Sequence, residues 1–328
     1  MTKEEKESKV VKPIKVEKEP QLEDISGVGP GTVEKLHDAG MVDVASVAVT
    51  NIKYLADTAG ISETLARKIQ KEANKMFNLN FMTITEVEEK DSKKKLIPIG
   101  ASDFDNLIGG GVETQAITEV AGKFSMGKSQ LAHILAVQCI IQNPKDYVAY
   151  IDTENTFKTS RIEQIAKDKG IDPEIIKKKL FVLRASSSDI QMFAVQRKLP
   201  ELILAKKNVR LVILDSLTAL FRCEFQGRGS LADRQQKLNG HMRDLKNFAD
   251  KYNAAIFVTN QVMSNPAQMY GDPDKPIGGN IVSHSSSLRI FLRQGQKGTR
   301  VAKLYDSTHL PDGECQFEIV EGGIINVK

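Results

Sequence analysis

The chain has 328 residues, of which 41% are hydrophobic and 27% charged, a composition typical of a globular protein with room for two domains. The formal net charge is only +4, so any affinity for nucleic acid must come from local basic clusters and not from the overall charge. Three widely spaced cysteines (Cys139, Cys223 and Cys315) exclude a disulfide framework, and the lack of a long apolar run predicts a cytoplasmic protein without a membrane span.

Residues 1 to about 20 alternate lysine with glutamate and hold almost no large apolar side chain. Such a segment cannot bury enough surface to offset the entropy of ordering, so we expect a disordered charged tail. A small all-α domain is expected over residues 21–78. It opens with a short helix from Leu22, a glycine-rich turn, and a second helix that places Val33 and Leu36 on one face.

The turn has the pattern of a helix-hairpin-helix, with glycines at Gly27, Gly29 and Gly31. Glycines let backbone N–H groups approach a DNA phosphate, so these three are candidate DNA contacts that read no base. A weaker echo of the pattern runs from Leu55 to Ser62 and leads into a predicted helix over Glu63–Met76. The alternative is a purely structural helical bundle with tight turns.

Residues 79–98 form a connector. Its first part, Phe81–Val87, has the pattern of a β-strand and precedes a charged run at residues 88–95. An apolar strand without a partner in its own chain could add to the sheet edge of another subunit, which makes it a candidate polymerisation strand. The alternative is a strand that docks on its own larger domain.

A phosphate-binding loop, G-x-x-x-x-G-K-S, stands between a β-like run at 116–121 and a helix-like run at 130–138. Its glycines would let backbone N–H groups point at an anion, and the helix N-terminus adds positive charge. Lys128 would reach the β- and γ-phosphates of ATP, and the Ser129 hydroxyl would hold Mg²⁺. The alternative is a glycine-rich turn that matches by chance. The candidate ATP-binding residues of the loop are Gly122, Lys123, Phe124, Ser125, Met126, Gly127, Lys128 and Ser129.

From about residue 99, strands alternate with helices, which predicts an α/β domain with a mostly parallel central sheet. Each of the clear strands ends in polar residues. In a parallel sheet these carboxyl ends share one rim, where ligands bind. The clear strands are Ile117–Ala121, Tyr147–Asp152, Val209–Asp215 and Ala255–Thr259.

Three residues at this rim are candidates for the chemistry of ATP hydrolysis. Asp215 is the carboxylate expected to hold Mg²⁺ through a water. Glu154 could orient and deprotonate the attacking water, and Gln261 could contact the γ-phosphate and sense the bound nucleotide. The alternatives are a surface or helix-capping carboxylate for Glu154 and a strand-end amide bonded to backbone for Gln261.

Two segments after the third and fourth strands are predicted to be functional loops. Residues 221–234 combine arginines and glycines with aromatic side chains, whereas residues 262–283 are rich in proline and glycine and too long for a plain connector. Since the second loop begins directly after Gln261, a contact with the γ-phosphate could move it. The alternatives are a solvent loop and a solvated basic patch.

Together these motifs resemble the archaeal RadA recombinases, relatives of bacterial RecA and of the eukaryotic strand-exchange proteins. The resemblance implies a RecA-like P-loop ATPase domain over residues 99–328 that forms filaments on single-stranded DNA. It also implies that ATP binds between subunits and that the bound strand pairs with homologous double-stranded DNA. The segments that carry the resemblance are Ile25–Leu36, Ile151–Glu154, Asp215–Arg222, Asn260–Met263, Gly271–Pro273, Pro276–Gly279 and His309–Pro311.

The resemblance implies roles for further residues. Arg161 would stack on adenine, and Pro311 of a neighbouring subunit would cover the other face of the base. His284 would reach the γ-phosphate across the interface, and Asp306 would approach it with a bound monovalent cation. The residues implied to contact DNA are Arg222, Arg228, Arg234, Gly278 and Gly279.

The chain departs from the family pattern in three places. Ser125 and Met126 stand where the family usually has glycine and serine, and Asn155 stands where glycine is usual. In the connector, Phe81 would anchor in the adjacent subunit, but Ile84 replaces the usual alanine.

The predicted function is that of a DNA-dependent ATPase that performs homologous strand exchange as a filament or ring on nucleoid DNA, with recombinase paralogues as possible loaders. A hexameric helicase is the rival enzyme, and the hairpin domain and connector strand argue against it. A non-catalytic recombinase paralogue that binds ATP and regulates a partner is the other alternative. Such paralogues often lack the N-terminal domain or the DNA loops, whereas this chain has both.

Overall fold

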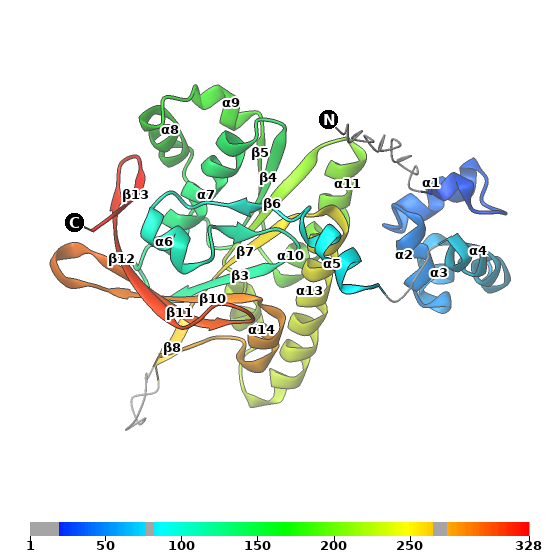
Figure 1. Ribbon diagram of the computed structural model, residues 1–328. Coiled ribbons are helices and arrows are strands. Elements are labelled where there is room, and N and C mark those ends of the chain that lie inside the picture. Colours follow the sequence, from blue (N-terminus) through cyan, green and yellow to red (C-terminus); the bar gives the residue numbers. More distant parts are fainter. Residues whose placement is uncertain (1–19, 77–81, 265–273, 328) are drawn as a thin grey trace, which may run out of the picture. The chain divides into compact units, whose positions relative to one another are not determined.

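The computed structural model describes residues 20–76, 82–264 and 274–327, and the chain divides into two compact units, the second beginning at Met82 (Figure 1). The described part of the smaller unit is all helical and has its own apolar core, which includes Leu36, Leu55 and Ile69. Its elements are η1 (Leu22–Asp24), α1 (Pro30–Asp38), α2 (Val44–Val49), α3 (Ile52–Ala59) and α4 (Glu63–Met76). The predicted helices on both sides of the glycine-rich turn, and the helices of its echo, are confirmed.

The larger unit is built on a nine-stranded sheet, counted over its described residues, with the order β13-β12-β11-β10-β3-β7-β6-β4-β5. The six strands from β10 to β5 run parallel, and β10 to β13 form an antiparallel extension. The strands are β3 (Ile117–Gly122), β4 (Asp146–Asp152), β5 (Leu180–Arg184), β6 (Asn208–Asp215), β7 (Ala255–Asn260), β10 (Leu288–Gln294), β11 (Arg300–Ser307), β12 (Gly313–Val320) and β13 (Gly323–Asn326). The predicted parallel strands are confirmed.

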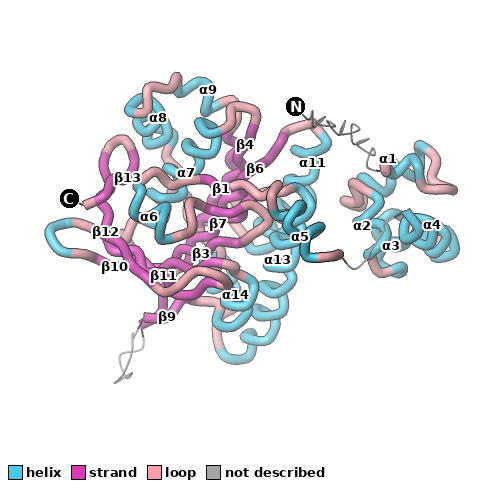
Figure 2. The backbone as a smooth tube through the Cα atoms, viewed as in Figure 1, coloured by secondary structure: helices cyan, strands magenta, loops and turns pink. Residues whose placement is uncertain are grey.

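Helices cover both faces of the sheet (Figure 2). Alternating strand residues divide between two cores, so that in β6 Ile213 packs with α6 to α9 and Val212 packs with η2 and α11 to α14. None of the described helices is both long and apolar enough to cross a membrane. The helices are α5 (Ile84–Asp91), α6 (Ser102–Leu107), α7 (Lys128–Gln142), α8 (Thr159–Asp168), α9 (Pro173–Lys177), α10 (Ser188–Phe193), η2 (Ala194–Lys198), α11 (Leu199–Leu204), α12 (Ala219–Glu224), η3 (Arg228–Ser230), α13 (Leu231–Tyr252), α14 (Gly279–Ser285) and η4 (Gln296–Gly298).

The strand predicted over Phe81–Val87 is wrong for its described part, because Ile84–Asp91 forms helix α5. The helix begins with a capping box: Glu86 N–H donates to Thr83 Oγ1 at 3.3 Å, and Thr83 N–H donates to Glu86 Oε2 at 2.7 Å. The Thr-x-x-Glu signal was present in the sequence and outweighs the β-like pattern. Phe81 lies outside the described residues, as does the predicted disordered tail before residue 20.

The two predicted functional loops are shorter than expected, because helices take up their ends. Arg222 belongs to α12 and Arg234 to α13, so only residues 225–230 separate these α-helices. The second segment opens and closes as a hairpin of β8 (Val262–Ser264) and β9 (Asp274–Pro276), with α14 after it. Residues 265–273 lie outside the described chain.

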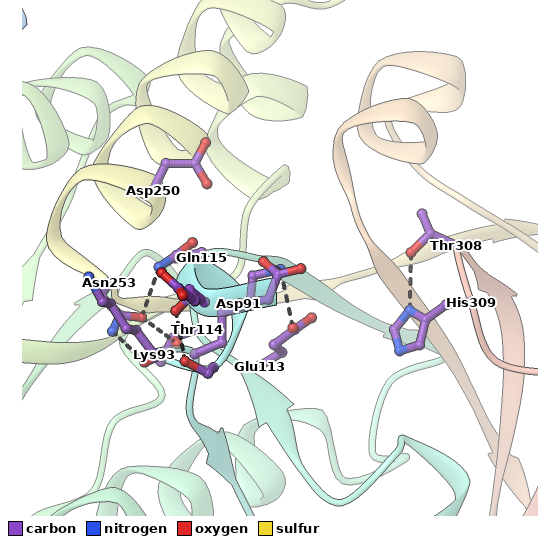
Figure 3. A network of polar contacts seen from close by, with 12 residues as sticks. Asp91, Lys93, Glu113, Thr114, Gln115, Asp250, Asn253, Thr308 and His309 are labelled. Atoms are coloured by element: carbon purple, nitrogen blue, oxygen red, sulfur yellow. Dashed lines mark hydrogen bonds and ion pairs between the residues drawn. The ribbon is translucent and has the colours of Figure 1, made fainter. Parts of the chain in front are cut away.

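The connector is fastened where it enters the larger unit, through β1 (Leu96–Ile97) and β2 (Val112–Glu113), which pair antiparallel. Asn253 Nδ2 donates to the Lys93 carbonyl at 2.8 Å, and the Thr114 hydroxyl donates to Asn253 Oδ1 at 2.6 Å (Figure 3). Thr114 Oγ1 also accepts the Lys95 N–H at 2.9 Å. The chain between α5 and the sheet is therefore held in place by Thr114, which follows β2, and by Asn253, which follows α13.

His241 in α13 is fully buried, and burial lowers its pKa to about 4. Because an unfolded histidine has a pKa of about 6.5, the unfolded chain binds more protons between these values, and stability is lost as the pH falls through them. We expect the free energy of unfolding to fall by about 2 kcal/mol between pH 7 and pH 5 from this group. Urea unfolding of the wild type and His241→Phe at both pH values measures it; an equal pH dependence in the two would contradict the prediction.

Candidate functional site

The phosphate-binding loop joins β3 to α7, as the sequence predicts. Gly127 has a φ of 101° and caps α7, and a Cβ at this position would lie 2.5 Å from Ile319 Cδ1. A Cβ at Gly122 would lie 2.7 Å from the Leu292 carbonyl oxygen. Both glycines are therefore needed for the loop to fit beneath its neighbours, and the loop presents its backbone at the N-terminus of a 15-residue helix.

Lys128 occupies the position of the phosphate-loop lysine at the start of α7. Its Nζ donates to the carbonyl oxygens of Gly122 at 2.9 Å and Lys123 at 2.8 Å, so the ammonium folds back over the loop. Burial lowers its pKa, and the nearby carboxylates of Asp215 and Glu154 oppose that shift. A half-buried cation in a concave loop of N–H groups is suited to binding a phosphate.

Asp215 at the end of β6 is almost completely buried and is held by three hydroxyl groups. Tyr150 donates to its Oδ2 at 2.7 Å and Thr156 to the same oxygen at 3.3 Å, while Thr259 donates to Oδ1. Burial raises the pKa of Tyr150 well above its ordinary value, and the Asp215 charge adds to the rise, so its hydroxyl stays protonated and donates. This fixed carboxylate and the Ser129 hydroxyl fit a hard cation such as Mg²⁺.

Glu154 and Gln261 lie side by side, as the shared rim predicts. Gln261 Nε2 donates to Glu154 Oε1 at 3.0 Å, and the Ser216 hydroxyl donates to the same oxygen at 2.7 Å. Arg222 Nη1 in turn donates to Gln261 Oε1 at 3.1 Å. A continuous series of hydrogen bonds therefore runs from Arg222, within the first predicted loop segment, to the carboxylate predicted to act on water.

The loop that carries Glu154 is fixed by Asp152. The Asp152 carboxylate accepts the N–H groups of Thr156 at 3.1 Å and Phe157 at 3.2 Å. Asn155 adopts a φ of 55°, a conformation that asparagine accepts more readily than most residues other than glycine. The turn beside Glu154 is thus formed without the glycine usual in the family.

The residues expected to face a neighbouring subunit lie at the other side of β3. His284 is exposed on α14, Asp306 is exposed on β11, and Pro311 lies in the loop that follows β11. Arg289 lies 3.9 Å from Asp306 Oδ2 and bonds Ser283, the residue before His284. The structure therefore connects Asp306 and α14 through one guanidinium.

The chain is similar to known proteins over both of its units. A family model described as Rad51 matches residues 92–327, which include the phosphate loop, Glu154, Asp215 and Gln261. The chain belongs to the Rad51 family. A second model, described as a SAM-like helix-hairpin-helix tandem, matches residues 19–75 of the smaller unit. The chain is 46% identical over 318 residues to the DNA repair and recombination protein RadA of Methanoculleus marisnigri, which covers 92% of this chain and 98% of that protein.

The helix-hairpin-helix glycines of this Rad51-family chain lie at an open surface. A Cβ on Gly29 or Gly31 would meet no atom within 4 Å, and one on Gly27 would meet only the Lys68 side chain, at 3.7 Å. Gly27 has a φ of 94°, which favours glycine. The predicted DNA-contacting backbone is therefore accessible within its own unit, and Lys68 adds a cation beside it.

Other predicted site residues of this Rad51-family chain are placed as follows. Arg161 on α8 donates to Gln130 Oε1 at 2.7 Å and to the Val320 carbonyl at 2.7 Å, so it joins α7 to the last hairpin. Gly278 has a φ of 101° and precedes α14 as its N-cap, and Gly279, the first residue of the helix, has a φ of 57°. Arg228 lies in η3, between α12 and α13.

Several residues that shape the site were missed in the sequence. Tyr150, Thr156 and Thr259 come from three different segments and meet only at Asp215, so no local pattern reveals them. Ser216 directly follows Asp215 and could have been found as a polar residue at the same strand end.

Ser125 adopts a φ of 64°, the left-handed conformation in which most residues other than glycine are strained. Ser125→Gly should change the free energy of unfolding by less than about 1 kcal/mol, because the relief of backbone strain in the folded state is offset by the greater conformational freedom of the unfolded chain. Ser125→Val should weaken binding of a fluorescent ATP analogue by about tenfold or more, because a β-branched residue cannot adopt this φ without distorting the loop. Equal dissociation constants for the two variants would show that the loop does not need this conformation.

Proposed function

We propose that this Rad51-family chain is an ATP-dependent homologous recombinase, a DNA-dependent ATPase that polymerises on single-stranded DNA and exchanges homologous strands. The observation that carries the proposal is the pair of hydrogen bonds that joins Arg222 to Gln261 at 3.1 Å and Gln261 to Glu154 at 3.0 Å. It joins a predicted DNA-contacting arginine to the candidate general base, so DNA and nucleotide would act on the same amide. The relative that is 46% identical is named a DNA repair and recombination protein, which supports the proposal.

In this proposal the phosphate loop, Lys128 and Ser129 bind the phosphates of ATP, with Mg²⁺ held by Ser129 and Asp215. The metal would neutralise phosphate charge when bound. Glu154 orients a water and accepts its proton, since its Oε1 is already fixed by Ser216 and Gln261. Gln261 has no basic group, so it senses the γ-phosphate and reports its state to the loop that begins at Val262.

A homo-oligomer, as a filament or ring, would complete the site. His284, Asp306 with a monovalent cation, and Pro311 would approach the ATP of the adjacent subunit, while Arg161 would stack on adenine. Exposed apolar side chains on and next to α5 support a subunit contact there, since Ile84 is 79% exposed and Met82 is 44% exposed. Paralogue loaders, double-stranded DNA at the hairpin domain, and a cytoplasmic, nucleoid-associated location belong to the same proposal.

Strand exchange between homologous single- and double-stranded DNA, with and without ATP, tests the function. We expect exchange only with ATP and Mg²⁺. ATP binding without pairing would favour the non-catalytic regulator, and unwinding of a duplex without homologous single strands would favour the hexameric helicase.

Arg222→Ala should lower the salt dependence of single-strand binding, because each lost phosphate contact releases about one counterion fewer. The log–log slope of affinity against salt should become shallower by about 1. Lys178→Ala, which removes an exposed cation outside both predicted loops, is the matched control and should keep the slope. An unchanged slope for Arg222→Ala would place the DNA elsewhere.

A further inference from the structure

A row of buried polar side chains crosses four neighbouring strands of the sheet, β7, β3, β10 and β11. Its members are Asn260, Glu119, Arg289 and, at its exposed end, Asp306. Arg289 lies opposite Glu119 in the parallel pair β10–β3 and opposite Asp306 in the antiparallel pair β10–β11. The row therefore connects β7, which directly precedes Gln261, to β11, which carries Asp306.

Glu119 is the centre of the row, and its side chain is 1% exposed. Arg289 Nε donates to its Oε2 at 2.6 Å, and Asn260 Nδ2 donates to its Oε1 at 2.6 Å. A buried carboxylate is costly unless it is paired and hydrogen-bonded, and here both oxygens are satisfied. Because apolar side chains of similar volume often stabilise such a position equally well, the ion pair suggests a role in fixing geometry.

At one end of the row, Asn260 bonds three separate segments. Its Nδ2 also donates to the Ile277 carbonyl at 2.6 Å, where the second loop returns, and its Oδ1 accepts from the Thr218 hydroxyl at 2.7 Å. Thr218 directly precedes α12, which carries Arg222. The residue that follows Asn260 is Gln261, so this end fixes the nucleotide sensor and the bases of both predicted DNA loops.

At the other end, Arg289 bonds the elements expected to face the neighbouring subunit. Its Nη1 donates to Ser283 Oγ at 2.9 Å, and Ser283 directly precedes His284 in α14. Nη1 lies 3.9 Å from Asp306 Oδ2, and the guanidinium lies 5.1 Å from the centre of the Tyr305 ring. One rigid guanidinium thus contacts α14 and β11 together.

We propose that Glu119 and Arg289 are positioning residues that couple Gln261, which senses the subunit's own nucleotide, to His284 and Asp306, which face the nucleotide of the adjacent subunit. The inference rests on the proposed function. A displacement of Asn260 cannot be absorbed by water or by loose packing, because the row is buried and fully bonded at its centre. Such a displacement is therefore transmitted to α14 and β11, and ATP binding in one site affects ATP turnover in the site of the adjacent subunit.

Glu119→Gln tests the proposal, because the amide keeps the volume but places an N–H against a donor from Arg289 or Asn260. In the full-length protein with single-stranded DNA, we expect turnover at saturating ATP to fall about tenfold. We also expect the Hill coefficient for ATP to fall to about 1. The dissociation constant of a fluorescent ATP analogue should change less than about threefold, since Glu119 does not belong to the phosphate loop.

Asp146→Asn is the matched control, because it breaks another buried ion pair of the same sheet. Asp146 lies 3.5 Å from Arg210, with side chains 3% and 10% exposed, near the amino ends of β4 and β6. Thermal unfolding of both variants compares their losses of stability. The control should keep the wild-type Hill coefficient and DNA stimulation, whereas equal changes in both variants would reduce Glu119 to a structural role and overturn the proposal.

Ser283→Ala decides the matter if Glu119→Gln does not fold, because it removes only the one hydroxyl that Arg289 contacts on α14. A lowered Hill coefficient supports the coupling, and an unchanged one overturns it. If DNA does not stimulate ATP turnover in the wild-type protein, the proposed function itself is contradicted. If the wild type responds to DNA and the variants keep the wild-type Hill coefficient, only the coupling is overturned.

Discussion

Lys128→Ala is expected to lower DNA-stimulated ATP turnover by about a hundredfold to a thousandfold. This is the usual effect of removing a preorganised donor that stabilises the charge developing in the transition state. The Lys128 ammonium donates to two loop carbonyls and is partly buried, whereas the loop's other lysine, Lys123, is exposed and pairs with Asp274 at 2.8 Å. Binding of ATP should weaken as well, because the cation contacts phosphate before and during the reaction. Phosphate release with saturating single-stranded DNA measures turnover, and a fluorescent ATP analogue measures affinity.

Lys145→Ala is the control for this experiment. Lys145 is exposed just before β4, at the amino ends of the parallel strands and therefore at the opposite edge of the sheet from the phosphate loop. It should retain full turnover. Wild-type turnover in Lys128→Ala would remove the assignment of the loop.

Glu154→Gln should lower the turnover number by about a hundredfold to ten-thousandfold, because the amide cannot accept a proton from water. ATP affinity should be kept, since an amide oxygen can still accept the bonds of Ser216 and Gln261 at 2.7 and 3.0 Å. Glu154→Gln thereby differs from Lys128→Ala, which loses binding and turnover together. Single-turnover hydrolysis of bound ATP isolates the chemical step.

Glu163→Gln is the matched control, since this α8 carboxylate pairs with Lys177 at 2.7 Å and is not part of the site. It should leave hydrolysis unchanged. Retained hydrolysis in Glu154→Gln would instead support the alternative of a surface carboxylate without a role in catalysis.

The parallel strands and the phosphate loop could be predicted from sequence because their signals are local. The run Leu211–Leu214 is apolar at consecutive positions and ends at Asp215 on the ligand-binding edge, and the loop Gly122–Ser129 begins at the end of a strand. The cluster of Glu154, Asp215 and Gln261 followed from one rule of parallel sheets. The rule holds here, since Gln261 bonds Glu154 and Tyr150 reaches Asp215 from the next strand.

The parts that could not be predicted depend on contacts between distant segments or on competing local signals. Asn260 and Glu119 are 141 positions apart, and only the β3–β7 register brings them together. The pattern of Phe81–Val87 predicts a strand, but the Thr83–Glu86 capping box favours a helix, and the apolar side chains of Ile84 and Val87 remain exposed on it. The sequence pattern predicts a loop at Arg222, although this residue belongs to α12, which begins at Ala219.

The separate cores of the two units bear on how any stability measurement of this chain should be interpreted. The helical unit buries Leu36, Leu55 and Ile69 among its own residues, whereas the sheet unit has two larger cores of its own. Units with independent cores commonly melt in separate steps, and one midpoint then averages two equilibria. Calorimetry should resolve two transitions, and a change at His241 or Ser125 should move only the one that belongs to the sheet.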